Sequence, residues 1–483
     1  METKKFLVGG TWRTSDATLD VVFPYTGETV AKIYRAGEAD VEAAITAAQR
    51  GFAETRALPA YARAEILHRL RALMAQHADD LIEAMILEGG KTRNVAEGEL
   101  TRAQETIRIS AEEAKRFDDD VIPMDWTPAG EGRFAVARRF PLGVVLGITP
   151  FNYPLNLACH KLGPAIAAGN AFILKPAPET PLSSLLLGEL VLEAGYPPEA
   201  LSVLLPTDAL AEQMARDPRI AYLTFTGSTE VGWHLKQVAG RKRVGLELGG
   251  NAAVILHEDA NVDYALRRIA VGGFTNAGQN CISVQRVLVH RSLYDDVLAR
   301  LIERVQQIQV GDPRDPETRV GPMIHPAAAE RAMSWVEEAV DQGAQVVLGG
   351  TREGTLFQPT ILTDVRPEMK VSCQEIFAPV VTVAPYDTFE EAVALANKTD
   401  YGLQGGVFTQ DINRILYAYE HMEVGGLQIN DVSTFRVDQM PYGGVKGSGV
   451  GREGPKYAIE EMTEVKLMVI NQPGGAPVSN EAE

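Results

Sequence analysis

The chain has 483 residues, with 64 acidic and 46 basic side chains and a net charge of −18. A chain of this length is expected to form about three domains, or two with elaborations, and a surface this negative repels phosphate backbones and anionic membranes. We therefore expect no nucleic-acid partner and no membrane partner, and the three cysteines, at positions 159, 281 and 373, are too few and too scattered for a disulfide framework or a metal site.

The N-terminal part of the chain is predicted to form short strands and then helices. It begins without an apolar signal segment, and no run of about 18 apolar residues follows, which predicts a cytoplasmic protein. Residues 1–40 show β-like segments separated by glycine-containing turns. Apolar residues at helical spacing predict helices over residues 41–53, 61–87 and 94–117.

Residues 118–140 have a different character. A run of aspartates precedes a stretch with Pro and Gly, and residues 133–138 then alternate like a strand. We interpret this segment as an exposed two-stranded arm of the kind that makes subunit contacts.

From Leu142 onward the pattern becomes strand–helix–strand. Apolar runs predict strands over residues 144–148, 171–174, 201–205 and 221–225. This alternation indicates a parallel sheet with helices on both faces. Ligands bind beyond the carboxyl ends of such strands, where Asn152, Lys175 and Gly227 are located.

A second α/β block is predicted from about residue 252 to residue 440. Its expected strands cover residues 253–256, 286–289, 346–348, 380–383, 405–408 and 426–429. A glycine-rich crossing segment follows at 441–449. The last residues, 476–483, belong to a tail rich in Pro, Gly and polar residues that we expect to be disordered.

Residues 225–232 follow a strand and begin a helix. Small residues there would let a diphosphate approach the helix N-terminus, where free N–H groups favour anions. The segment lacks the G-x-G-x-x-G pattern, and Gly-Ser-Thr is also common at ordinary helix starts. Lys175 could hydrogen-bond ribose hydroxyls or phosphate, or could be a solvated surface lysine.

Three polar residues and one thiol are candidates for chemistry. Glu247 lies in an apolar, glycine-bounded segment, where desolvation would suit a general base; pairing with Arg243 is the alternative. Asn152 could donate a hydrogen bond to an oxyanion or merely hold a turn. Glu375, taken by itself, could likewise have a functional or a purely structural role. Cys281 ends a small polar loop in which an electrophile could reach its sulfur.

These pieces occur in a specific order along the chain. The combined pattern resembles the NAD(P)-dependent aldehyde dehydrogenase superfamily, from about residue 5 to residue 470. The branch that it resembles most contains lactaldehyde, non-phosphorylating glyceraldehyde-3-phosphate and phosphonoacetaldehyde dehydrogenases. The motifs that carry the resemblance are FNYP at 151–154, LKP at 174–176, TGSTEVG at 226–232, LELGG at 246–250, GQNC at 278–281, EIF at 375–377 and PYGGVKGSGVGREG at 441–454.

The resemblance implies an α/β protein with a Rossmann-like cofactor domain, a second α/β catalytic domain and a β-arm. The cofactor domain would comprise residues 1–119 and 141–250 with part of 444–464, and the catalytic domain residues 251–443. The arm would comprise residues 120–140 and 465–475, and it would make a homodimer or homotetramer.

The resemblance also implies roles for individual residues. Cys281 would be the nucleophile, Glu247 the general base, and Asn152 with the Cys281 N–H the oxyanion hole. The aldehyde would become an acid through a thiohemiacetal and a thioester. Cofactor binding would fall to Thr149, Pro150, Lys175, Gly227, Ser228, Gly232, Glu375 and Phe377. Substrate binding would fall to Arg102, Tyr153, His160, Asn280, Ile282 and Phe435.

Two positions depart from the family pattern. Ala378 stands where the family usually has Gly, and its methyl group is expected to shift the loop only slightly. Pro178 stands where NAD-preferring members commonly carry Glu toward the adenosine ribose. We expect NAD as the better cofactor, with NADP possible.

The substrate is left between two classes of aldehyde. A small hydroxylated or short-chain aldehyde is the first choice, because Asn280 replaces the Arg of some phosphate-binding members. An anionic aldehyde such as glyceraldehyde-3-phosphate, phosphonoacetaldehyde or succinate semialdehyde is the second, with Arg102 as the partner of its tail. The alternative for Arg102 is a surface ion pair with Glu99 or Glu105. A CoA-acylating enzyme and a catalytically silent binding protein are weaker alternatives.

Overall fold

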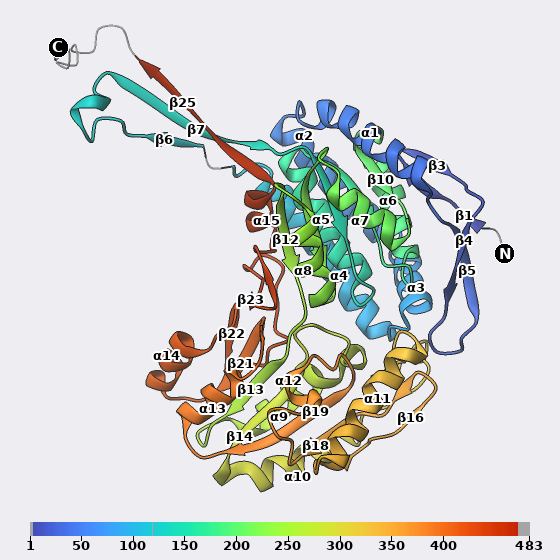
Figure 1. The fold of residues 1–483 in the computed structure, drawn as a ribbon, viewed down its shortest axis with the longest axis vertical. Coiled ribbons are helices and arrows are strands. Elements are labelled where there is room, and N and C mark those ends of the chain that lie inside the picture. The colour runs from blue at the N-terminus through green and yellow to red at the C-terminus, as the bar shows by residue number, and fades with distance from the viewer. Residues whose placement is uncertain (1–2, 118, 472–483) are drawn as a thin grey trace.

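Three β-sheets organise the part of the chain that the structure describes. The computed structural model describes residues 3–117 and 119–471, so the tail predicted at 476–483 lies outside the described residues. An eight-stranded sheet and a seven-stranded sheet form the centres of two α/β units, and a three-stranded sheet forms a projecting arm. Figure 1 shows the units one above the other, with the arm extending away from the first.

The eight-stranded sheet confirms the predicted parallel arrangement. Its strand order is β24-β12-β11-β8-β9-β10-β2-β3, and the central run from β12 to β10 is parallel throughout. β8 and β9 are buried along their whole length, which explains why they read as continuous apolar runs. The strands are β2 (Phe6–Val8), β3 (Thr11–Arg13), β8 (Val144–Ile148), β9 (Ala171–Lys175), β10 (Leu201–Val203), β11 (Ile220–Thr226), β12 (Arg243–Glu247) and β24 (Gly449–Val450).

Helices α1 to α8 pack around this sheet. The single helix predicted over 61–87 is wrong, because the chain breaks at His77, where φ is −101° and ψ is 28°. Apolar spacing continues across the break, so periodicity alone does not reveal it. The helices are α1 (Glu38–Thr55), α2 (Ala60–Gln76), α3 (Ala78–Gly89), α4 (Arg93–Glu113), α5 (Pro154–Ala168), α6 (Leu182–Glu193), α7 (Asp208–Arg216) and α8 (Thr229–Val238).

The second unit is built on the order β15-β18-β19-β14-β13-β21-β22. All neighbours run parallel except β15, and β18 is a strand that the sequence did not indicate. The strands are β13 (Ala252–Leu256), β14 (Val284–His290), β15 (Gln345–Leu348), β18 (Thr360–Thr363), β19 (Val380–Tyr386), β21 (Gln404–Phe408) and β22 (Gly426–Ile429). The helices are α9 (Val262–Phe274), α10 (Tyr294–Val305), α11 (Pro326–Asp341), α12 (Lys370–Cys373), α13 (Phe389–Asn397) and α14 (Ile412–His421).

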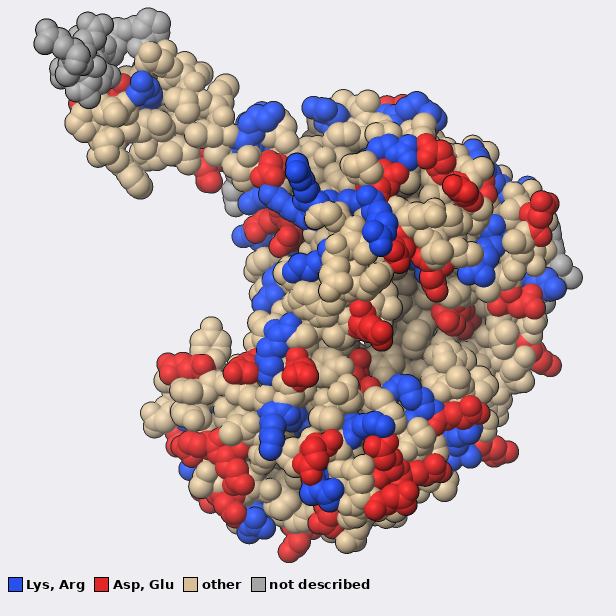
Figure 2. All heavy atoms as spheres, in the orientation of Figure 1, with Lys and Arg blue, Asp and Glu red and all other residues tan. Residues whose placement is uncertain are grey.

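The arm consists of β6 (Asp120–Ile122), β7 (Arg133–Pro141) and β25 (Thr463–Asn471), in the order β25-β7-β6. The third strand, β25, comes from the C-terminal segment that the resemblance assigned to the arm as residues 465–475, of which residues 472–475 lie outside the described part of the chain. In Figure 2 the arm shows mainly uncharged atoms, whereas acidic side chains are spread over the second unit. Exposed apolar side chains on the arm are Val121, Ile122, Trp126, Phe134, Phe140, Val465, Leu467, Met468, Val469 and Ile470.

Smaller elements complete the described chain. They are β1 (Thr3–Lys4), β4 (Thr18–Val22), β5 (Thr29–Tyr34), β16 (Arg352–Glu353), β17 (Leu356–Phe357), β20 (Tyr401–Gly402), β23 (Val445–Lys446) and α15 (Pro455–Glu461). Across residues 3–117 and 119–471, none of the helices combines the length and the apolar composition needed to cross a bilayer.

Candidate active site

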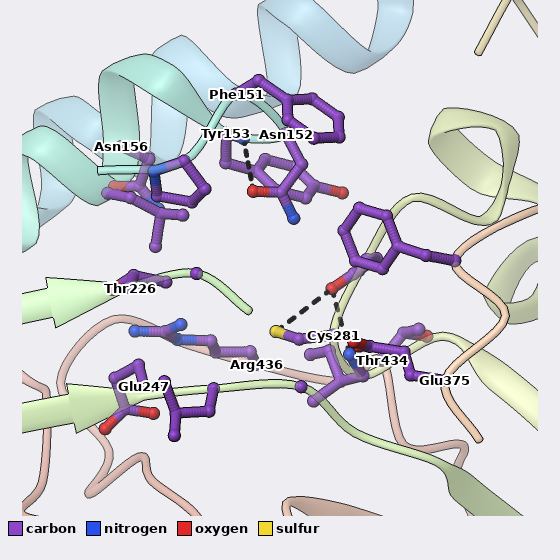
Figure 3. A pocket seen from close by; sticks show the side chains of 18 of the residues that line it. Phe151, Asn152, Tyr153, Asn156, Thr226, Glu247, Cys281, Glu375, Thr434 and Arg436 are labelled. Atoms are coloured by element: carbon purple, nitrogen blue, oxygen red, sulfur yellow. Dashed lines mark hydrogen bonds between the residues drawn. The ribbon is translucent and has the colours of Figure 1, made fainter. Parts of the chain in front are cut away.

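A cavity of about 570 Å³ lies where the two α/β units meet. The carboxyl ends of β8, β11 and β12 approach it from the first unit, and the loop before β14 approaches it from the second. Figure 3 shows Asn152 and Cys281 on opposite sides of this space, with Glu247 deeper on the side of β12. The cavity is thus at the edge of the sheet where parallel α/β proteins bind ligands.

The loop that carries Cys281 has an unusual backbone. Asn276, Ala277 and Gly278 have φ values of 56°, 54° and 67°, a left-handed conformation that disfavours ordinary side chains. The turn is held because Asn276 Nδ2 donates to Asn152 O at 3.2 Å and Gln279 Oε1 accepts from the Ile324 N–H at 2.9 Å. This bonded turn places the thiol at the cavity wall.

The Cys281 thiol has two polar neighbours. Its Sγ lies 3.1 Å from the Tyr442 hydroxyl and 3.8 Å from Asn280 Oδ1. Removal from water raises the pKa of Cys281 to about 12, and the hydrogen bond with Tyr442 acts in the opposite direction. In this state the sulfur is protonated near neutral pH, so its use as a nucleophile requires stabilisation of the thiolate.

Asn152 connects the thiol loop to the first unit. Its Nδ2 donates to Gln279 O at 3.1 Å, and its Oδ1 accepts from the Tyr153 N–H at the same distance. An amide nitrogen carries two hydrogens, so one donor is left for the cavity. The amide therefore has a fixed orientation, with one hydrogen-bond donor left on the wall of the cavity that Cys281 also lines.

Buried charges hold the segment that follows Asn152. Glu99 from α4 accepts from the N–H groups of Leu155 and Asn156 at 2.9 and 3.0 Å, and so caps the start of α5. Its other oxygen lies 3.0 Å from Lys91 Nζ, and that ammonium group lies 4.0 Å from the centre of the Tyr153 ring. Both carboxylate oxygens of Glu99 are therefore occupied, one by the start of α5 and the other by Lys91.

Glu247 is buried at the end of β12. Its Oε2 has no hydrogen-bond partner among the described residues, and Arg243 bonds to Glu464 instead. Desolvation, followed by repulsion from Glu453, raises the pKa of Glu247 well above its usual value. A carboxyl group with a raised pKa and a free oxygen suits proton transfer in the cavity.

A buried ionic cluster behind Glu247 was not anticipated from the sequence. Lys161 Nζ lies 2.9 Å from Glu453 Oε1, and Arg436 NH2 lies 3.2 Å from Glu453 Oε2. Desolvation opposes ionisation of Glu453, but attraction by Lys161, His160 and Arg436 outweighs it and lowers the Glu453 pKa to about 2. One sequence signal was present: Lys161 is a charged residue on α5, a helix that is buried on every side, so it must be paired.

Arg102 lines the cavity but does not form the pairs considered for it. Its NH2 lies 2.8 Å from Asp438 Oδ1, whereas Glu105 bonds to Arg108 at 2.7 Å. His160 bonds to the same Asp438 oxygen at 2.9 Å from behind the cavity wall. Burial, followed by repulsion from Arg436, lowers the pKa of His160, which favours the neutral imidazole.

The start of α8 is suited to an anion. Ser228 is its N-cap residue but makes no side-chain cap, so the N–H groups of the first turn remain available. A Cβ at Gly232 would lie 2.2 Å from Leu248 Cδ2, so any larger residue there would require the Leu248 side chain to move. Thr149, at the end of β8, has a buried Oγ1 without a partner among the described residues. Lys175 Nζ lies 3.6 Å from Asp208 Oδ1.

The opposite wall comes from the second unit. Glu375 Oε1 accepts from the Gly250 N–H at 2.9 Å, and burial raises the pKa of Glu375 to about 7. Phe377 has a φ of 53° and packs edge-to-face on Phe151 with ring centres 5.9 Å apart. Ala378 is not among the residues with positive φ, so its methyl group causes no backbone strain. A dinucleotide fits three features of the first unit. These are the free N–H groups at the start of α8, the close packing of α8 at Gly232 and the unpartnered hydroxyl of Thr149.

The structure brings most of the predicted residues to the cavity. Those that line it are Cys281, Glu247, Asn152, Pro150, Gly227, Ser228, Glu375, Phe377, Arg102, Tyr153, Asn280 and Ile282. The predicted residues outside its lining are Thr149, Lys175, Gly232, His160 and Phe435. Phe435 is 41% exposed, while its neighbours Thr434 and Arg436 line the wall. Lining residues that the sequence did not single out include Arg268, Arg331, Arg436 and Tyr442.

Comparison with known proteins identifies the class. The model of the aldehyde dehydrogenase family matches residues 12–468. The 3-sulfolactaldehyde dehydrogenase of Priestia megaterium is 45% identical over 465 residues, which cover 96% of this chain and 97% of that protein. The chain therefore belongs to the aldehyde dehydrogenase family, whose members oxidise aldehydes to acids with NAD or NADP.

Two solved structures share the whole fold. Aldehyde dehydrogenase 21 from Physcomitrella patens, in complex with the reaction product succinate, has a TM-score of 0.96 and 40% identity, covering 98% of this chain and 100% of that chain. Glyceraldehyde-3-phosphate dehydrogenase from Methanocaldococcus jannaschii, complexed with NADP, has a TM-score of 0.91 and 36% identity, covering 95% and 99%. The predicted fold class and enzyme class are thus confirmed.

Proposed function

We propose that the substrate is a short aldehyde with an anionic tail, and that a hydroxylated sulfonate such as 3-sulfolactaldehyde is the first candidate. The observation that carries this proposal is an excess of positive charge at the cavity wall. Lys161 and Arg436 share one carboxylate, Glu453, while burial raises the pKa of Glu247 and so favours its uncharged form. Two cations against one anion leave a positive charge for the substrate to pair with.

Arg436 is the side chain placed to use that charge. It lines the cavity, its side chain is only 6% exposed, and its Nε has no partner among the described residues. A buried donor without a partner is costly, and an anionic substrate group would satisfy it. Arg102 also lines the cavity and is a second contact for the tail.

The relatives support the same class of substrate. The names and titles of the three proteins compared above give sulfolactaldehyde, succinate and glyceraldehyde-3-phosphate, all of which carry an anionic group. The sequence favoured a small hydroxylated aldehyde over an anionic one. 3-Sulfolactaldehyde is both hydroxylated and anionic, and the position of Arg436 supports our ranking of anionic aldehydes ahead of neutral ones.

Cys281, Asn152 and Glu247 would carry the chemistry. The Cys281 sulfur attacks the aldehyde carbon, and the resulting alkoxide accepts from the free Asn152 amide hydrogen and the Cys281 N–H. NAD(P)⁺, when bound, would supply the hydride acceptor for oxidation of the substrate carbon, and the product of that oxidation would be a thioester on Cys281. Ionised Glu247 then takes a proton from water, whose oxygen attacks the thioester, and the C–S bond breaks to release the acid.

Cofactor binding is assigned to the first unit and to Glu375. The free N–H groups at the start of α8, beside Gly227 and Ser228, would hold the diphosphate. Lys175 and Glu375 would bind the two riboses, and the buried Thr149 hydroxyl would form a hydrogen bond with the dinucleotide. We propose the same division of domains as above, with residues 1–119 and 141–250 binding the cofactor.

The arm is proposed to join subunits into a homodimer or homotetramer. Its apolar side chains, including Trp126 at 85% exposure, have no covering element in the described chain. Exposed apolar patches of this kind mark association sites.

The test is a comparison of two substrates that differ only in their tail. Lactaldehyde has a methyl group where 3-sulfolactaldehyde has a sulfonated methylene group. We expect a higher kcat/KM for the sulfonate, and we expect Arg436→Gln to lower that value more than the value for lactaldehyde. Because both substrates meet the same Cys281, general damage to the site cancels in the ratio. A preference for hexanal or benzaldehyde, or an unchanged ratio in Arg436→Gln, would contradict the proposal.

A further inference from the structure

Tyr442 is a buried residue with a fixed ring. It is 3% exposed, and its backbone exchanges two hydrogen bonds with Glu453, with Tyr442 N to Glu453 O at 3.0 Å and Glu453 N to Tyr442 O at 2.6 Å. The guanidinium carbon of Arg436 lies 3.6 Å from the centre of the Tyr442 ring. This stacked cation holds the ring in place and draws electron density from it, which strengthens the hydroxyl as a donor.

The hydroxyl of Tyr442 points at the sulfur. Among the hydrogen bonds of the described residues, its partner is Cys281 Sγ at 3.1 Å. Buried tyrosine hydroxyl groups nearly always find a partner, so the sulfur accounts for the presence of a hydroxyl here. Burial raises the pKa of Tyr442 well above its usual value, which favours the protonated phenol.

The charge on the sulfur decides the direction of this hydrogen bond. A neutral thiol can donate to the phenol oxygen or accept from it. A thiolate has no proton, so only the phenol can then donate. The bond is therefore strongest when the sulfur is negative, since hydrogen bonds to charged groups are about twice as strong as neutral ones.

We propose that Tyr442 is a catalytic residue whose hydroxyl donates to Cys281 Sγ whenever the sulfur carries negative charge. The proposal rests on the nucleophilic role of Cys281 proposed above. It applies first to the free thiolate, after the thiol proton has passed to water. It applies again when the C–S bond of the thioester breaks and its electron pair returns to sulfur. Tyr442 keeps its own proton in both steps.

The test follows alkylation of Cys281 by iodoacetamide as a function of pH, with the modified peptide measured by mass spectrometry. A hydrogen bond to a charged group contributes about 1.5–3 kcal/mol, so Tyr442→Phe is expected to displace the rate–pH curve toward higher pH by about one to two units. The rate at a fixed neutral pH should fall by less than this displacement implies, because a more basic thiolate is a better nucleophile. A merely structural role for Tyr442 would lower the yield of folded protein without moving the curve.

The control is Tyr419→Phe, the same change at a tyrosine on α14 that is 75% exposed. The curve of Cys281 alkylation rate against pH for this variant should match that of the unmodified protein. A ring-fluorinated tyrosine at position 442, which is a stronger donor, should move the curve toward lower pH and does not depend on how Tyr442→Phe folds. Coincident curves for Tyr442→Phe and the unmodified protein would overturn the proposal for Tyr442. Full aldehyde oxidation after complete alkylation of Cys281 would instead overturn the proposed function.

Discussion

Asn152 Nδ2 donates a 3.1 Å hydrogen bond to the backbone oxygen of Gln279, two residues before Cys281. The bond joins the turn after β8 in the first unit to the thiol loop of the second. It therefore sets the position of the second Asn152 amide hydrogen relative to the sulfur. An oxyanion formed on a substrate attached to Cys281 would meet a donor that is already oriented.

The first prediction concerns this amide. Asn152→Ala removes both the loop contact and the free donor, and loss of one oxyanion donor lowers kcat by about 10²–10³. Steady-state kinetics with a saturating aldehyde would measure the loss. A decrease below tenfold, in a variant that melts like the unmodified protein, would show that another group stabilises the oxyanion.

The second prediction concerns the nucleophile. Cys281→Ala is expected to abolish aldehyde oxidation, because no other group at the cavity wall is placed to form the thioester. Cys159→Ala and Cys373→Ala are matched controls, since neither residue lines the cavity, and they should retain most activity. NAD(P)H formation at 340 nm reports all three; sustained oxidation by Cys281→Ala would exclude a covalent mechanism through this residue.

The third prediction concerns Glu247. Glu247→Gln should still form the acyl thioester but release the acid slowly, so an acyl adduct should accumulate in intact-protein mass spectra. The pKa of Glu247 is raised by burial, so the base is protonated at low pH. Turnover of the unmodified enzyme should therefore increase as pH rises through that pKa, and the adduct should be most abundant on the acidic side. Ordinary turnover by Glu247→Gln would assign the base elsewhere.

The fourth prediction concerns the cofactor. Pro178 has no carboxylate to bind a ribose 2′-hydroxyl or to repel a 2′-phosphate, so NAD and NADP should both work, with NAD preferred. We expect their kcat/KM values to differ by less than about 10³, which corresponds to roughly 4 kcal/mol. Pro178→Glu should increase the preference for NAD. A larger ratio in the unmodified enzyme would reveal a further contact with the adenosine ribose.

The fifth prediction concerns stability and pH. The pKa of Glu453 falls from 4.5 to about 2 in the folded protein, so its ion pairs stabilise the fold fully above pH 4.5. That contribution is lost as pH falls from 4.5 toward 2. Glu453→Gln leaves Lys161 and Arg436 buried without an acid, a change that costs about 3–5 kcal/mol.

Thermal melting across this pH range is the measurement. The melting temperature of Glu453→Gln should lie well below that of the unmodified protein at neutral pH, and the difference should shrink in acid. Glu105→Gln is the control, because Glu105 pairs with Arg71 and Arg108 at the surface, where an ion pair contributes little. Equal effects of the two substitutions would show that the buried cluster does not stabilise the fold.

Local patterns predicted the sheets well. β8 occupies the predicted residues 144–148 because a strand buried on both faces is a continuous apolar run with turn residues at its end. The break at His77 was missed because the apolar spacing of α2 continues into α3. The local pattern of residues 118–140 does not show the third strand of the arm, because β25 comes from more than 300 residues further along the chain; only the family resemblance assigned that segment to the arm.

Some residues of the candidate active site were likewise predicted from local sequence, and others were not. Glu247 ends a strand two residues before a glycine, and Asn152 lies shortly after a strand, two residues from a proline on either side, so their positions were readable from local sequence. The pairing of Lys161 with Glu453, and of Glu453 with Arg436, could not be predicted from the sequence. Both Glu453 and Arg436 are about 275 or more positions from Lys161 along the chain. Charge pairs between distant segments leave no periodic signal, and Arg102 finding Asp438 instead of Glu99 has the same cause.

The C-terminal strands have a consequence for the order of synthesis. β24 completes the edge of the first sheet next to β12, and β25 pairs with all of β7. The first unit therefore remains unfinished until the ribosome has translated almost the whole chain, including the second unit between them. Nascent chains stalled before residue 449 should expose the edge of β12 and be sensitive to proteolysis, even though most of the first unit has already emerged.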